Sequence, residues 1–99
     1  MTIEYVGKAD TMLAEYSAML ERSDVRNTEA RALLAEAEDL AAQSRELGSA
    51  EFMAEPAEAA EISAHRAMLQ QQIDSKSGLV MQLHHETYQE WEQFTATQW

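Results

Sequence analysis

The only proline of the chain constrains the fold more than any other residue. Pro56 lies near the middle of the 99 residues and favours the first position of a helix, where its missing N–H would have no intrahelical partner. Gly48, shortly before it, is a residue type that commonly ends a helix. The sequence therefore predicts a single domain over residues 1–99, made of a helix over about 5–47, a turn over 48–55 and a helix over about 56–97.

Both predicted helices show a repeat that is typical of paired helices. Good helix formers dominate, and no strand-like alternation occurs. Apolar or small residues recur at spacings near 3.5, which predicts an all-α antiparallel helical hairpin. The first contact line runs through Ala9, Met12 or Leu13, Tyr16, Met19 or Leu20, Ser23, Arg26 or Asn27, Ala30, Leu33 or Leu34, Ala37, Leu40 or Ala41, Ser44 and Leu47. The second runs through Ala60, Ile62, Leu69, Ile73, Val80, Leu83, Tyr88 or Thr87, Trp91 and Phe94.

Two stretches of poor helix propensity, 23–28 and 74–78, interrupt the repeat without changing its phase. This favours continuous helices that are weak in the middle. The alternatives are a capped restart at Asn27 or Thr28, and an end at Ser77 with a restart near Leu79.

The two weak stretches face each other if the turn is centred near residues 51 and 52. Facing residue numbers then add to about 103, which brings Asp24 near Lys76 and Arg26 near Asp74. We interpret these four residues as a polar belt that fixes the register of the two helices. The alternative is a coincidence of two ordinary solvated patches.

The two ends of the predicted hairpin differ in composition. Near the turn, residues 32–64 are rich in acids and alanine, and a solvated surface is favoured there over a docking tip for a basic partner. The open end carries an aromatic cluster, which one hairpin covers poorly, so a second hairpin completing a four-helix bundle is predicted. The predicted partner or dimer interface is Tyr16, Tyr88, Trp91 and Phe94, with Tyr5 and Trp99 at the same end.

Composition restricts the partners and the location. A net charge of −11 disfavours binding to nucleic acid or to anionic membranes. The chain lacks cysteine, any apolar run long enough to span a membrane, and a cleavable leader pattern. We therefore expect a protein partner, and a location in the cytoplasm or outside the cell without a cleaved signal peptide.

Catalytic and metal-binding patterns are weak. His84 and His85 point about 100° apart on a helix and cannot both bind one ion from one side. Glu61 and His65 supply two ligands at most, and no serine has a glycine elbow. The sequence therefore predicts no metal, no cofactor and no enzymatic activity.

The length, acidic composition, central helix–turn–helix and the segment Tyr88-Gln89-Glu90-Trp91-Glu92 resemble the WXG100 family of small proteins exported by type VII secretion. Tyr88 and Glu92 match that family's Tyr-x-x-x-Asp/Glu export signal. The turn differs, because Glu46-Leu47-Gly48 stands where the family has Trp-x-Gly. The resemblance implies a helical hairpin that pairs into a four-helix bundle.

Three functional hypotheses follow. The first is a non-enzymatic interaction protein, either a secreted subunit or its co-exported partner. The second is an acidic cytoplasmic chaperone or adaptor for a subunit of a secretion system or flagellum. The third is an acidic mimic of DNA, which the sequence favours least.

Overall fold

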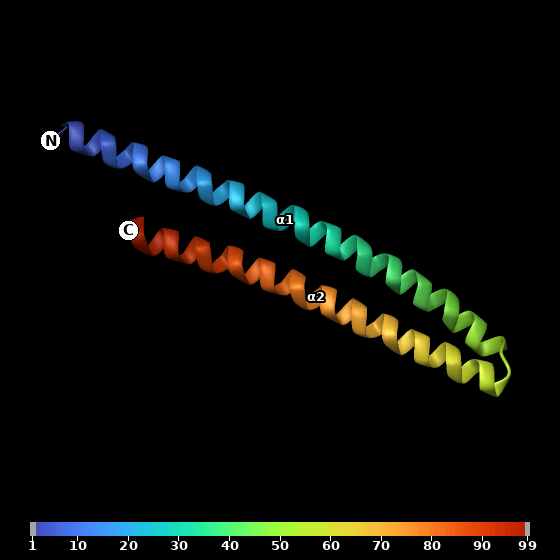
Figure 1. Ribbon diagram of the computed structural model, residues 1–99. Helices are drawn as coiled ribbons and strands as arrows, with labels where there is room; N and C mark the ends of the chain where they lie inside the picture. The colour runs from blue at the N-terminus through green and yellow to red at the C-terminus, as the bar shows by residue number, and fades with distance from the viewer. Residues whose placement is uncertain (1, 99) are drawn as a thin grey trace. The chain divides into compact units, whose positions relative to one another are not determined.

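The computed structural model describes residues 2–98, and the side chains of residues 7–97. It contains two helices, α1 (Thr2–Met53) and α2 (Pro56–Gln98), which Figure 1 shows joined by a short connection. Ala54 and Glu55 are the only described residues outside a helix. The helices pack against each other as a hairpin, which confirms the predicted all-α fold. The side chains of Tyr5 and Trp99 lie outside the described residues.

Pro56 sets the position of the turn. It is the first residue of α2, as predicted, and the carbonyl of Glu55 accepts the N–H of Ala59 at 2.8 Å. The ring of a proline disfavours helical backbone at the preceding residue, so α1 ends before Glu55. The N–H of Ala54 closes this end on the carbonyl of Glu51 at 3.2 Å.

The prediction that Gly48 ends the first helix, and with it a turn that begins at residue 48, is wrong. Gly48 lies inside α1, and no described glycine has a positive φ. A Cβ at this position would lie 3.2 Å from the guanidinium of Arg66, which hydrogen-bonds Glu51 at 2.8 Å. Gly48 therefore makes room for an arginine between the helices. The residues that follow it are compatible with a helix, and only Pro56 stops α1.

Both stretches of poor helix propensity are helical. α1 continues through 23–28 and α2 through 74–78, as the unchanged phase predicted. The hydroxyl of Thr28 donates to the carbonyl of Asp24 at 2.9 Å, so this polar side chain is satisfied within the helix. The alternative of a restart in either helix is wrong.

Contacts divide the chain into two compact units, and each contains a segment of both helices. Unit 1 comprises Met1–Glu29 and Gln82–Trp99, and unit 2 comprises Ala30–Met81. In unit 2 the end of α1 and the start of α2 lie next to each other on either side of the turn (Figure 1).

The contact surface between the helices is one narrow line per helix. Only five described hydrophobic side chains are buried: Met19 in unit 1, and Ala30, Ala37, Leu69 and Val80 in unit 2. Half-buried and buried residues follow alternating spacings of three and four, which confirms the predicted line of α1 from Met19 to Leu47. On α2 the line reaches the end of the helix through Leu83, Thr87, Glu90 and Phe94. Thr87 is thus the correct alternative to Tyr88, and Glu90 takes the place predicted for Trp91.

Candidate interaction surface

Three aromatic side chains of unit 1 form a cluster between α1 and α2. The ring of Tyr16 lies 6.2 Å from that of Trp91 with an edge-on geometry, and 5.6 Å from that of Phe94. The rings of Trp91 and Phe94 stack at 6.1 Å. Such pairs each contribute about 0.5–1.5 kcal/mol beyond the area that they bury. The cluster fixes the orientation of Trp91 even though this side chain remains 45% exposed.

The structure thus brings together three of the four residues predicted at the interface. Tyr88, the fourth, is 60% exposed and lies one turn before Trp91 on α2. Neither Tyr88 nor Trp91 is on the contact line between the helices. Both side chains extend from the edge of that line. They are available to a partner without unfolding of the hairpin.

The two sides of unit 1 differ in composition. Leu13, Tyr16 and Leu20 follow spacings of three and four on α1, so they share one side of that helix. Trp91 contacts Tyr16, so the exposed edge of α2 that carries Trp91 and Tyr88 lies on the same side. We call the surface formed by these five residues the apolar face of unit 1. All five are more than one third exposed.

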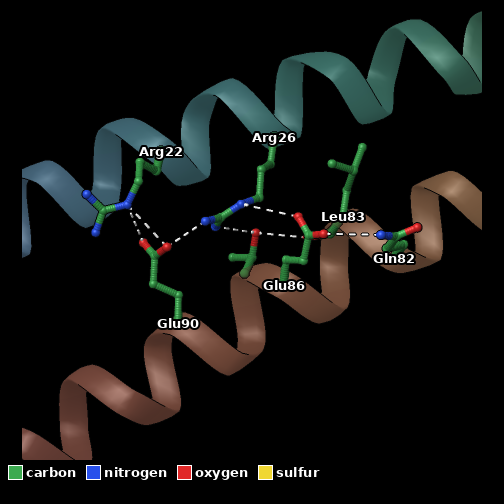
Figure 2. A network of polar contacts seen from close by, with 7 residues as sticks. Arg22, Arg26, Gln82, Leu83, Glu86 and Glu90 are labelled. Carbon is green, nitrogen blue, oxygen red and sulfur yellow. Dashed lines mark hydrogen bonds and ion pairs between the residues drawn. The ribbon is translucent and has the colours of Figure 1, made fainter.

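A network of polar contacts joins the two helices of unit 1 along the contact line and beside it (Figure 2). Arg22 follows Leu20 by two residues, which places it about 200° around the helix. Its Nε donates to both carboxylate oxygens of Glu90, at 3.1 and 3.2 Å. Arg26 donates to Glu90 at 2.5 Å and to the hydroxyl of Thr87 at 3.2 Å, and pairs with Glu86 at 3.9 Å.

Glu90 is the centre of this network. Its side chain is 22% exposed and that of Arg26 is 17% exposed, whereas Arg22 is 56% exposed. Burial by itself raises the pKa of Glu90, but the hydrogen bonds from Arg26 and Arg22, together with their positive charges, outweigh it. The net effect is a pKa of Glu90 below its ordinary value of 4.5. The ionised form of Glu90 therefore stabilises unit 1.

This shift predicts a dependence of stability on pH. Because the pKa of Glu90 is lower in the folded chain, its contribution is complete above pH 4.5 and is lost as the pH falls through the folded value. Glu90→Gln should cost about 1 kcal/mol at pH 7, since one partner is exposed and screened by solvent. Urea unfolding of parent and variant, followed by circular dichroism, measures the difference. Acid also relieves repulsion among the other carboxylates, so the difference between the two chains is the informative quantity. It should shrink toward zero as the pH falls from 4.5 through the folded pKa of Glu90, and a constant difference would contradict this role.

The predicted polar belt has different partners in the structure. Arg26 binds Glu90, and Lys76 binds Glu36 at 2.6 Å, whereas Asp74 accepts a hydrogen bond from Gln70 at 2.9 Å. The pairings of Asp24 with Lys76 and of Arg26 with Asp74 are therefore wrong. The residue numbers of Arg22 and Glu90, Arg26 and Glu86, and Lys76 and Glu36 each add to 112 rather than to about 103. The turn lies at residues 54–55 instead of 51–52, which raises the expected sum to about 109 and accounts for most of the difference.

Unit 2 has its own ion pairs and a smaller set of exposed apolar side chains. Arg66 binds Glu51 and approaches the hydroxyl of Ser44 at 3.4 Å. Phe52 and Met53, at the end of α1, are almost fully exposed. A shallow, open hollow is lined by Met68, Gln71, Gln72, Ser75, Lys76 and Leu79. No ring cluster holds the exposed residues of this unit in place among the side chains that the structure describes.

Within residues 2–98, no group of three or more potential metal-ligating side chains comes together. Neither helix, over its described length, is long and apolar enough to cross a membrane.

Sequence reasoning missed the residues that bind Arg22 and Arg26. Glu86 and Glu90 were missed because the predicted contact line ran through Trp91, and Thr87 appeared only as the alternative to Tyr88. The spacing from Leu83 through Thr87 and Glu90 to Phe94 is a regular alternation of four and three, and it was the available signal. It was overlooked because two of these residues are polar.

The comparisons with known proteins found no match. No protein-family model matches this chain, and neither a curated protein nor a solved structure matches it.

Proposed function

We propose that this protein is a non-enzymatic protein–protein interaction module, and that the apolar face of unit 1 binds a helical partner. The observation that supports the proposal is the one-sided arrangement of Leu13, Tyr16, Leu20, Tyr88 and Trp91, all substantially exposed. Burying a large apolar side chain contributes roughly 1.5–3 kcal/mol. Five such residues on one side form a contiguous apolar patch, whereas exposed apolar residues are normally scattered singly over a protein surface.

A second helical hairpin is the simplest partner for this surface. Each helix of the present hairpin uses one contact line, and the apolar face lies beside it. A hairpin packed on that face would complete a four-helix bundle and cover the exposed apolar side chains of both helices. The ring cluster supports this function, because aromatic anchors held in one orientation lose little entropy on binding.

The similarity to secreted proteins of the type VII pathway extends this proposal to export. Tyr88 and Glu92 lie one helical turn apart on α2 and are both exposed, so one receptor surface can contact both side chains. Under this proposal the protein leaves the cell without a cleaved leader. The alternative, a cytoplasmic chaperone or adaptor, uses the same apolar face to shield a client. Export into the medium distinguishes the first function, and a stoichiometric client that aggregates when alone distinguishes the second.

Photo-cross-linking in the native cell tests the interaction. A photoreactive phenylalanine analogue at position 88 should form a covalent adduct with one predominant protein, because Tyr88 is exposed at the edge of the apolar face. The matched control carries the same analogue at Gln93, which is two residues from Trp91 and therefore lies about 200° around α2. Adducts are identified by mass spectrometry. Equal labelling from both positions, or none from position 88, would contradict the proposal.

A further inference from the structure

We propose that the partner, on the premise of the function proposed above, presents an amphipathic helix with an apolar stripe bordered by lysine or arginine. The inference comes from the charges around the apolar face. They select a partner of opposite charge over a second copy of this chain.

Acidic residues border the apolar face on both helices. On α1, Asp10 lies one turn before Leu13 and Asp24 lies one turn after Leu20, so both are on the side of those leucines. On α2, Glu92 lies one turn after Tyr88 and so shares the side of that tyrosine. All three carboxylates are exposed, and none of the ion pairs among the described residues involves them.

The basic residues of unit 1 lie elsewhere. Arg22 and Arg26 belong to the polar network with Glu90. Lys8, the remaining lysine or arginine of this unit, precedes Leu13 by five residues, which separates the two side chains by about 140° around α1. The border of the apolar face therefore has no lysine or arginine to neutralise its carboxylates. His84 and His85 are the other ionisable residues along the α2 edge.

A second copy is a poor occupant of this surface. A symmetric dimer places the same patch on both subunits, so the apolar faces meet and the acidic borders meet as well. Like charges opposite each other weaken such a contact, and the chain already carries a net charge of −11. Lysine or arginine at the same places would instead complete charge-assisted contacts around an apolar centre.

Two synthetic helical peptides of about 21 residues, long enough to span about 30 Å, test the inference. Both carry leucines at spacings of three and four, and one has lysines and the other glutamates along the borders of the leucine stripe. Binding to the full chain is measured by fluorescence anisotropy at pH 8. The lysine peptide should bind at least about tenfold more tightly than the glutamate peptide, and salt should reduce the difference.

Two triple variants of equal net charge separate the border from general acidity. One combines Asp10→Asn, Asp24→Asn and Glu92→Gln, and the other combines Glu38→Gln, Glu46→Gln and Glu61→Gln, which are exposed residues of unit 2. The border variant should lower affinity for the lysine peptide about tenfold, and the unit 2 variant should change it less than about twofold. Because all six side chains are exposed, both variants should retain the helical spectrum of the parent.

Each outcome bears on a distinct step. Equal loss of affinity in the two triple variants would mean attraction to overall charge and would overturn the inference. Self-association of the parent through the apolar face, measured by sedimentation and abolished by Leu20→Gln, would also overturn it but would leave the interaction function standing. If neither peptide nor a second copy binds, and position 88 gives no adduct in the cell, the proposed function fails together with the inference.

Discussion

Leu69→Ala should lower the free energy of unfolding by about 2–4 kcal/mol, the range for deleting a buried leucine side chain. Leu69 is 4% exposed and is one of only five buried hydrophobic residues in the described part of the chain. A contact line this narrow has few other side chains that could fill the space. Urea unfolding followed by circular dichroism measures the change, which we expect as a lower midpoint with a similar slope.

The neighbouring residue provides the control. Met68 is 61% exposed, so Met68→Ala removes a side chain of similar size that has not been taken out of water. It should change stability by less than about 0.5 kcal/mol. Equal effects of the two substitutions would mean that the contact line of α2 is not where the structure places it.

Trp91→Ala should weaken binding to the protein that cross-links at position 88 about thirtyfold, as expected for an interface residue worth about 2 kcal/mol. Trp91 is held against Tyr16 and Phe94 and remains accessible, which combines a fixed orientation with area left to bury. Titration calorimetry with the purified partner measures the affinity.

Two further variants separate recognition from folding. Tyr88→Ala removes a more exposed ring and should weaken binding without changing the helical spectrum. Gln93→Ala, on the opposite side of α2, should leave the affinity unchanged. If Trp91→Ala and Tyr88→Ala both bind like the parent, the partner uses another surface.

Under the proposed function, stability and recognition depend largely on separate residues. Glu90 and Trp91 are adjacent in the sequence, yet Glu90 lies on the contact line with Arg26, while Trp91 extends from its edge beside Tyr16. A rotation of about 100° per residue separates the two side chains. Glu90→Gln should thus affect mainly stability, whereas Trp91→Ala should affect binding and also, through the lost ring contacts with Tyr16 and Phe94, stability.

The sequence by itself determined the two helices and where α2 begins. A repeat near 3.5 residues is a local property, readable without knowing the partner helix, and it survives both stretches of poor propensity. Pro56 acts through its own ring and on the residue before it, so its effect is also local. These two features suffice for an all-helical hairpin with α2 starting at Pro56.

Only the tertiary structure decided which residues face each other. That Gly48 leaves space for the guanidinium of Arg66 could be seen only once the two helices were placed side by side. If the turn centre is misplaced by about three residues, the residue expected opposite any given position is wrong by about six residues, nearly two helical turns. The prediction for Arg26 failed for this reason. The choice between Tyr88 and Thr87 likewise depended on packing across the helices, because adjacent residues fit the local repeat almost equally well.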